Sequence, residues 1–378
     1  MSLVSAGMGY RWGVLPVLLV VGLAAACADR NEPPAAAPVL VSATWPGDVA
    51  VPKKADPLPA TPVGRSAAIY LPDPNSRDVY LVTETGRQYR LVPLGQTALP
   101  KPQPTPAQDP GATVPIDPTF GVGLSPDGRW LTETNWGSGG GRVLRDLTGT
   151  ATVALPRTDM PRFWSPGGRL LLLNVHSADV KDAQVELDPA TGTRTPVAQD
   201  VCGDGGFGVV AVLDDGKLLC KPVRGYNDGA APVKAEPGTE VFRVAAAGGG
   251  TRQFTVDLRS RLADKSTVIS AGPPDSAGHF LALAYDGGRN RAFVVSLADG
   301  KVLREVAVPA EKVEGFEVWL VGGFDGDKVI GVRRVDIGSP TPIAEPIQVT
   351  WLADAGAPKV VATFPREAVL ILRGTTAG

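Results

Sequence analysis

The sequence predicts an all-β fold, a β-propeller of six blades. Two nearly identical segments, Ser-Pro-Asp-Gly-Arg-Trp-Leu from Ser125 and Ser-Pro-Gly-Gly-Arg-Leu-Leu from Ser165, each lie between two apolar runs. Pro, Asp and Gly in this order are typical of a tight turn, so each segment predicts a β-hairpin. The copies start 40 residues apart, the length of one four-stranded blade. From Ser66 onward, β-type runs alternate with turn clusters, and no run has the periodicity of a helix.

The predicted strands fall into sets of four. Three runs lie between 66 and 94, and one run is left over at 368–374. Together these four make a sixth blade in which the C-terminal strand takes the innermost position, and this closure removes the free edges of an open array. A ring of seven blades is the alternative. The five complete sets cover 120–155, 161–198, 207–257, 268–308 and 316–364.

The two turn motifs resemble the WD40-like propeller repeats of TolB-type bacterial proteins. The resemblance extends over about 66–374, with two close copies at Ser125 and Ser165. It implies a propeller fold more than a particular function, because one fold hosts many functions. The Gly-His and Trp-Asp pairs of eukaryotic-type WD40 repeats are absent, so the resemblance is to the bacterial class only.

Residues 1–26 are typical of a signal peptide, with Arg11 followed by an apolar run that is short for a membrane span. The run ends in Leu23-Ala24-Ala25-Ala26-Cys27, which resembles a bacterial lipobox with Ala24 where Leu is usual. The resemblance implies that Cys27 becomes the diacylglyceryl-modified N-terminus. The protein would then be bound to a membrane through this lipid, in the cell envelope on the outer side of the cytoplasmic membrane. The alternative is cleavage after Ala26 and secretion.

Residues 27–65 are rich in Pro and Ala, a composition that favours extended polyproline II and predicts a semi-rigid tether. Within it, the segment 38–45 is apolar enough to dock on the folded domain. The predicted organisation is a signal peptide at 1–26, a tether at 27–65, a propeller at 66–374 and a short tail at 375–378.

Composition and motifs argue against several function classes. The formal net charge is −2 and no basic run is present, so nucleic-acid binding is not expected. His176 and Asp179 offer two metal ligands where zinc needs three or four. The Asp-Gly clusters at 202–206 and 324–327 are the places where Ca²⁺ could bind, but turn formation explains them adequately. Asp127 is interpreted as a turn former, and we assign no catalytic residue, metal or cofactor.

The candidate binding surface is the loop face, which we define as the face that carries the connections between strands two and three of each blade and between blades. The opposite turn face carries the short turns between strands one and two and between strands three and four. Aromatic and Arg side chains on exposed loops are typical anchors of interfaces. The loop-face candidates include 285–291 and, individually, Trp136, His176, Arg224, Tyr226, Asn227 and Arg289.

These features favour a module that binds or scaffolds a protein, peptide or small-molecule ligand on the loop face. The alternative is a propeller enzyme, similar to a lactonase or lyase, with a metal at the channel mouth. Such a site needs a cluster of metal ligands, and only two His residues are present, which counts against an enzyme.

Cys202 and Cys220 are the only thiols besides Cys27. An oxidising compartment and an even count favour a disulfide between them. However, a hairpin turn at 214–216 would place Cys220 opposite about Val210, several residues from Cys202, and a bridge needs Cα atoms within roughly 7 Å. The sequence leaves both outcomes open.

Overall fold

The structure is a computed structural model. Within the ranges that it describes, the chain forms strands β1 to β25 and turns, with no helix. None of these residues therefore form a helix long and apolar enough to cross a membrane. The description covers 44–373 except for 73–77, 92–121, 135–141, 157–158, 175–183, 199–200, 204–206, 223–235, 247–249, 265–266, 288, 310–316, 336–344, 355 and 366–368.

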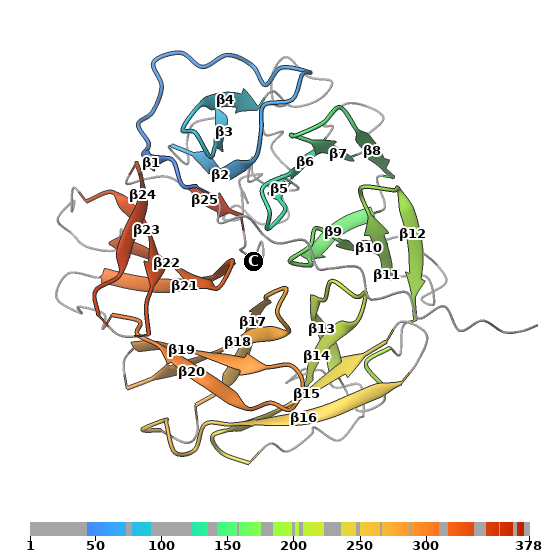
Figure 1. The fold of residues 1–378 in the computed structure, drawn as a ribbon, viewed down its shortest axis with the longest axis vertical. Helices are drawn as coiled ribbons and strands as arrows, with labels where there is room; N and C mark the ends of the chain where they lie inside the picture. The colour runs from blue at the N-terminus through green and yellow to red at the C-terminus, as the bar shows by residue number, and fades with distance from the viewer. Residues whose placement is uncertain are drawn as a thin grey trace, which may run out of the picture. The chain divides into compact units, whose positions relative to one another are not determined.

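The strands form six antiparallel sheets arranged as the blades of a ring (Figure 1). Blade 1 consists of β25 (Val369–Leu372), β2 (Ser66–Leu71), β3 (Val79–Thr83) and β4 (Gln88–Leu91). Blade 2 consists of β5 (Gly123–Leu124), β6 (Trp130–Thr134), β7 (Arg142–Asp146) and β8 (Thr152–Leu155). Blade 3 consists of β9 (Asp159–Trp164), β10 (Leu170–Asn174), β11 (Gln184–Asp188) and β12 (Thr193–Val197).

Blade 4 consists of β13 (Phe207–Val212), β14 (Leu218–Pro222), β15 (Thr239–Ala245) and β16 (Thr251–Asp257). Blade 5 consists of β17 (Ile269–Pro274), β18 (His279–Asp286), β19 (Arg289–Ser296) and β20 (Val302–Val306). Blade 6 consists of β21 (Glu317–Asp325), β22 (Lys328–Val335), β23 (Ile347–Leu352) and β24 (Lys359–Phe364). The predicted all-β propeller of six blades is confirmed.

Blade 1 combines the two ends of the propeller sequence. β25 pairs antiparallel with β2, with Leu372 opposite Ala68 and Val369 opposite Leu71. The sheet order is β25-β2-β3-β4, so β25 occupies the place that the first strand holds in the other blades. In Figure 1 it lies toward the centre of the ring, as do β5, β9, β13, β17 and β21.

Apolar side chains between neighbouring blades form the core. Between blades 4 and 5, Phe242 and Phe280 are fully buried, with ring centroids 5.0 Å apart in an edge-on arrangement, and Phe254 packs against both. Burying a side chain of this size contributes about 1.5–3 kcal/mol relative to leaving it exposed. Strands such as β2 and β3, whose residues are all buried, bury side chains on both faces of the blade, whereas the outer strand β16 alternates between buried and exposed residues near its end.

Part of the predicted tether lies along the propeller. β1 (Gly47–Asp48) adds a fifth, parallel strand to blade 6, with Gly47 opposite Ala362 of β24. Further on, Pro57 forms a bridge with Arg90 of blade 1, and the amide of Val63 donates to the carbonyl of Leu147 in blade 2 at 2.9 Å. Residues 44–65, which we call the strap, therefore run along blades 6, 1 and 2 (blue in Figure 1). For this stretch the spacer interpretation is wrong, because its backbone groups are bonded to the ring.

The seam between blades 1 and 6 contains a buried cluster of charged and aromatic side chains. Arg373, which follows β25, is 1% exposed and forms an ion pair with Glu84, and its Nη2 donates to the carbonyl of Thr44 at 3.1 Å. Its guanidinium lies 4.5 Å from the ring centre of Trp45. The indole Nε1 groups of Trp45 and Trp351 each donate to Oδ2 of Asp325 at 2.8 Å. We call Arg373, Glu84, Asp325, Trp45 and Trp351 the closure cluster.

The closure cluster joins five parts of the chain: the strap, the β3–β4 turn of blade 1, the inner hairpin of blade 6, strand β23 of the same blade and the residue after β25. Burial lowers the pKa of Arg373, and the negative charges of Asp325 and Glu84 oppose that shift. A buried charge is tolerated when it is paired and hydrogen-bonded, as it is here.

We predict that a chain truncated after Phe364 loses cooperative thermal unfolding and aggregates. Without β25 and Arg373, the inner edge of β2 is exposed and the closure cluster loses its cation. The measurement is a thermal melt followed by circular dichroism and light scattering. A control that lacks only 375–378 keeps the full-length transition. If the chain ending at Phe364 melts like that control, closure by β25 does not hold the ring.

Candidate binding face

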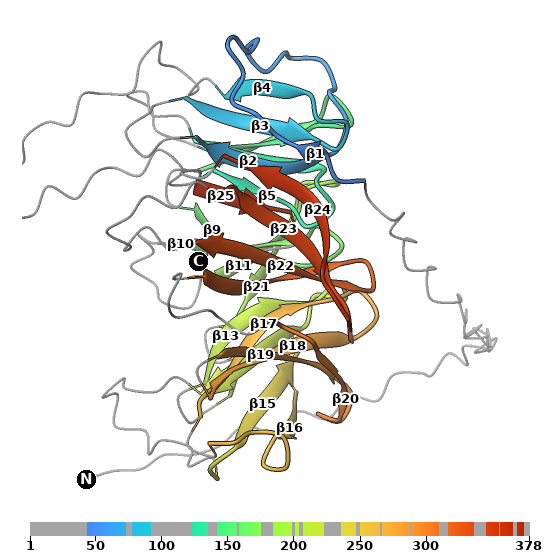
Figure 2. The same cartoon turned by 90° about the vertical axis from the view of Figure 1, so that its left-hand side faces the viewer.

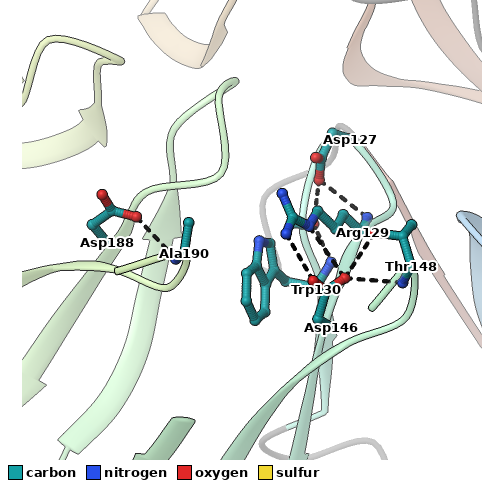
Figure 3. Close-up of polar contacts among 8 residues, drawn as sticks. Asp127, Arg129, Trp130, Asp146, Thr148, Asp188 and Ala190 are labelled. Atoms are coloured by element: carbon teal, nitrogen blue, oxygen red, sulfur yellow. Dashed lines mark hydrogen bonds and ion pairs between the residues drawn. The ribbon is translucent and has the colours of Figure 1, made fainter. Parts of the chain in front are cut away.

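The repeated motif forms a hydrogen-bonded turn on the turn face (Figure 3). The carboxylate of Asp127 accepts from the Ser125 hydroxyl at 2.6 Å and from the Arg129 amide at 3.1 Å. The Ser125 hydroxyl oxygen in turn accepts from the Trp130 amide at 2.8 Å. Asp127 is therefore a turn residue, as its position in the motif predicts.

The Arg of the motif binds a buried carboxylate on the third strand of its own blade. Arg129 donates through Nε and Nη2 to the two oxygens of Asp146, at 3.1 and 2.7 Å (Figure 3). Burial raises the pKa of Asp146, but hydrogen bonds from Arg129 and Thr148 outweigh it and hold the pKa below its ordinary value. In the next blade, Arg169 and Glu186 repeat this pairing at 2.8 Å.

The second copy of the motif has Gly167 where the first has Asp127, and the structure gives the reason. The Gly167 amide donates to the carboxylate of Asp214, which belongs to the first turn of the next blade. A Cβ on residue 167 would lie only 2.8 Å from Oδ1 of Asp214. The carboxylate that stabilises this turn thus comes from the neighbouring blade, and a larger residue at 167 would require this carboxylate to shift.

Other acids of the turn face also bind groups within their own blade. Asp275 accepts from the amides of Ala277 and His279, and the Nδ1 atom of His279 lies 2.8 Å from its other oxygen. Asp188 accepts from the Ala190 amide at 2.9 Å (Figure 3). The short turns therefore use these side chains for backbone geometry.

Of the six loop-face residues predicted individually, one lies within the described part of the chain, and the predicted stretch 285–291 is described except for 288. Arg289 begins β19 and is exposed, next to the hairpin that joins β18 to β19 in blade 5. The other five candidates lie outside the described residues, so the structure does not show whether the six come together. These five are Trp136, His176, Arg224, Tyr226 and Asn227.

The hairpin that carries Arg289 is held by a buried carboxylate. Asp286 accepts from the amides of Ala263 and Asp264, at 2.9 and 2.8 Å, and from Nη1 of Arg291 at 3.1 Å. These backbone donors, followed by Arg291, lower the pKa of Asp286. Arg291 also donates through Nε to Glu305 on β20 at 3.0 Å. The hairpin base is thus fixed to the blade and to the connection that precedes it.

Two large apolar side chains are exposed in this part of the molecule. Tyr285, the residue before Asp286, is 59% exposed, and Leu320 of the innermost strand β21 is 46% exposed. The side-chain amide Nδ2 of Asn290 donates to the backbone carbonyl of Trp319 at 2.8 Å and so connects the hairpin to β21. Tyr285 falls within the predicted stretch 285–291, whereas the exposure of Leu320 is not predicted, because a Leu within an apolar run is typical of a core residue.

Cys202 and Cys220 form a disulfide, with Cα atoms 5.8 Å apart, and both are buried. Cys220 lies opposite Val209 on β13, one residue from the predicted position. Cys202 comes within reach because Gly203 adopts a left-handed φ of 74° and because Nη1 of Arg243 donates to the Cys202 carbonyl at 2.9 Å. Whether Cys202 comes close enough to Cys220 to form this bond could not be predicted from the sequence.

The described residues contain no group of three or more His, Cys, Asp or Glu side chains that could hold a metal ion. What they do present on the loop face is a hairpin with a fixed base, an exposed aromatic ring and an exposed guanidinium. Such an arrangement can contact a partner through apolar area and charge.

No protein-family model and no curated protein matches the sequence. Similar solved structures include TolB from Acinetobacter baumannii, with 12% identity over 81% of this chain and 66% of that chain and a TM-score of 0.37. They also include the β-propeller domain of the Trilobed protease from Pyrococcus furiosus, with 8% identity, coverage of 80% and 98% and a TM-score of 0.39. Oligogalacturonate lyase from Vibrio parahaemolyticus matches with 12% identity, coverage of 65% and 65% and a TM-score of 0.35. At these values the similarities say nothing of ligand or reaction.

We predict that Asp286→Asn lowers the free energy of unfolding at pH 7 by about 1–3 kcal/mol, because the hydrogen bonds that the buried, charged carboxylate accepts are weakened. Since the pKa of Asp286 is depressed in the folded protein, its stabilisation is present above its ordinary pKa of 3.8 and is lost as pH falls through the folded value. Urea titrations at pH 7 and pH 3 therefore show a smaller difference for the variant than for the wild type.

Asp354→Asn is the matched control, because Asp354 is mostly exposed and pairs with Arg304 at the surface. Its expected effect is below about 0.5 kcal/mol. Equal effects of the two substitutions would show that Asp286 does not fix the hairpin.

Proposed function

We propose that the protein is an exported, lipid-anchored propeller that binds a protein, peptide or small-molecule partner on its loop face, at the outer side of the cytoplasmic membrane. The observation that carries export is the disulfide between Cys202 and Cys220, because such bonds persist in oxidising compartments and are rare in the cytosol. The lipobox-like segment that ends at Cys27 supports the lipid anchor.

The different roles of side chains on the two faces support binding on the loop face. On the turn face, the Arg and Asp side chains of the repeated motif are engaged in contacts within and between blades. The loop face carries the long connections, in which side chains are not required for the turn geometry and can vary to suit a partner. Its described part presents Tyr285 and Arg289, two residue types that anchor interfaces. No observation on the described residues favours the alternative of a propeller enzyme.

Lipidation is tested by Cys27→Ser, which removes the acceptor thiol. We expect the variant to lose incorporation of an alkyne fatty acid and to move from the detergent phase to the aqueous phase in Triton X-114 partitioning. Ala24→Leu, which brings the segment closer to a lipobox, is the control and keeps both properties. A Cys27→Ser chain that still carries the label would exclude a lipid at this position.

Binding is tested by crosslinking the intact lipoprotein in envelope preparations, identifying the captured partner and measuring its affinity. We expect Trp136→Ala combined with Tyr226→Ala to weaken binding at least tenfold, about 1.4 kcal/mol, with little change in melting temperature. The matched control is Arg129→Ala combined with Lys217→Ala on the turn face, which leaves affinity unchanged. Normal binding by the first pair together with loss of binding by the second would show that the partner uses the turn face.

A further inference from the structure

We propose that the loop-face end of blade 5 binds an extended, acidic segment of a partner protein. An apolar side chain of that segment packs on Val268 and Tyr285. A carboxylate two or three positions away in the segment pairs with Arg289 and Arg261. This inference rests on the proposed binding at the loop face, whose partner it narrows to one chemical class, and it does not depend on the lipid at Cys27.

Two exposed apolar side chains lie side by side where β17 begins and β18 ends, at the loop face, which is on the left in Figure 2. Val268 is 46% exposed and Tyr285 is 59% exposed. Val268 directly precedes Ile269, and Tyr285 directly follows Ala284, the residue that pairs with Ile269. Opposite residues of an antiparallel pair project from the same face of a sheet. Val268 and Tyr285 therefore present their apolar area to solvent together.

This apolar pair lies over the seam between blades 5 and 6. Tyr285 continues the row of β18 to which Leu283 belongs, and Leu283 packs against the core cluster between these blades. Opposite Tyr285 on β19, the side chain of Asn290 donates to the carbonyl of Trp319 on β21 at 2.8 Å. Leu320, the next residue of β21, is 46% exposed. The apolar seam thus continues past the closed core and ends in side chains that are open to solvent.

The other face of the same hairpin carries two exposed arginines. Arg289 is opposite Asp286, in the row of β18 that faces blade 4 through Ala284. The connection from blade 4 brings Arg261 next to this row, because the Arg261 carbonyl accepts from Nη1 of Arg291. Both Arg261 and Arg289 are exposed, and among the described residues neither guanidinium has a hydrogen bond or an ion pair. These two cations are therefore available to an anionic group from another molecule.

The carboxylates of the hairpin and of β20 are already engaged. Asp286 is buried and accepts from two backbone amides and from Arg291, and Arg291 also pairs with Glu305. Among the described residues, this leaves two exposed cations, Arg261 and Arg289, and one exposed anion, Asp264. Guanidinium groups bind carboxylates through strong, charge-assisted hydrogen bonds. This end of blade 5 therefore favours an acidic ligand, although the chain as a whole has a net charge of −2.

The spacing of the apolar pair and the arginines fits an extended peptide. They project from opposite faces of one sheet, and side chains placed in this way are about 10 Å apart, the spacing of packed sheets. An extended chain rises about 3.3 Å per residue. A segment that crosses the tip of the hairpin therefore reaches both features when its apolar residue and its carboxylate are two or three positions apart. An aromatic ring and a guanidinium are also the residue types that anchor protein interfaces.

An anionic bilayer is another surface that combines apolar and acidic groups. Protein surfaces that bind acidic lipids carry clusters of about four to eight Lys or Arg. The described residues of this end of blade 5 offer two exposed cations, and Asp264 would bring a carboxylate to the lipid phosphates. These charges favour the acidic peptide over the bilayer.

The test is a selection of random 12-residue peptides displayed on phage. The bait is the full chain with Cys27→Ser, so that no lipid contributes to binding. Peptides that also bind the same chain with Tyr285→Ala and Arg289→Glu are removed, and the affinities of the enriched peptides are measured by fluorescence anisotropy. We expect these peptides to contain Asp or Glu two or three positions from Leu, Ile, Phe or Trp. We expect Tyr285→Ala alone to weaken their binding at least tenfold.

Charge reversal tests the arginines directly. Arg289→Glu should weaken binding at least tenfold, and exchanging the acidic residue of the peptide for Lys should improve binding to this variant at least threefold. The matched controls are Leu303→Ala, at a side chain 46% exposed on β20 of the same blade, and Lys301→Glu, at an exposed residue of the β19–β20 turn. Both controls leave the affinity unchanged, and all four variants keep the wild-type melting temperature.

The proposal is overturned if no peptide is enriched, if the enriched peptides lack the acidic residue, or if Tyr285→Ala and Arg289→Glu leave their affinities unchanged. Flotation of the Cys27→Ser chain with phosphatidylglycerol vesicles, lost in the Tyr285→Ala variant, would assign this surface to lipid instead. In each of these cases, binding on the loop face still stands if Trp136→Ala combined with Tyr226→Ala weakens binding of the captured envelope partner.

Discussion

The ring depends on the buried guanidinium of Arg373. This one group contacts the carboxylate of Glu84 in blade 1, lies near that of Asp325 in blade 6 and stacks on Trp45 of the strap. A propeller must join its first and last blades, and here the joint combines strand pairing between β2 and β25 with a charge that is buried only when both chain ends are in place. The closure cluster therefore couples the N-terminal strap to the C-terminal strand.

Other blades are also stabilised by ion pairs and hydrogen bonds between Arg side chains, carboxylates and turn amides. In blades 2 and 3 an Arg after the first turn binds an acid on the third strand, and at Gly167 the neighbouring blade supplies the carboxylate. These turn-face contacts connect strands within a blade and connect one blade to the next. Because the turn-face side chains are engaged in these contacts, the loop face is the surface whose side chains can vary, and we propose partner binding there.

The sequence predicts what is local and repeated. The motifs at Ser125 and Ser165 and their spacing predict the blade, because a tight turn is encoded by a few adjacent residues, and grouping the β-type runs in fours predicts six blades. It does not predict the strap or the closure cluster, since Trp45 and Asp325 are 280 positions apart and β1 is two residues long within a Pro-rich segment. The Cys202–Cys220 bond depends on a left-handed Gly203, and the exposure of Leu320 depends on the surroundings of an innermost strand; neither is visible in a local pattern. Of the six loop-face candidates named individually, Arg289 lies within the described residues, and the other five remain predictions.

The most direct test of the central claim, that the strap and the C-terminal residue close the ring together, is a double-mutant cycle between Trp45→Ala and Arg373→Met, measured by urea unfolding at pH 7. Stacking of a guanidinium on a desolvated indole is worth about 1–2 kcal/mol, and the shared carboxylate of Asp325 adds to the coupling. We expect a coupling energy of at least about 1 kcal/mol. Additivity of the two substitutions within about 0.5 kcal/mol, the behaviour of independent sites, would contradict this account of closure.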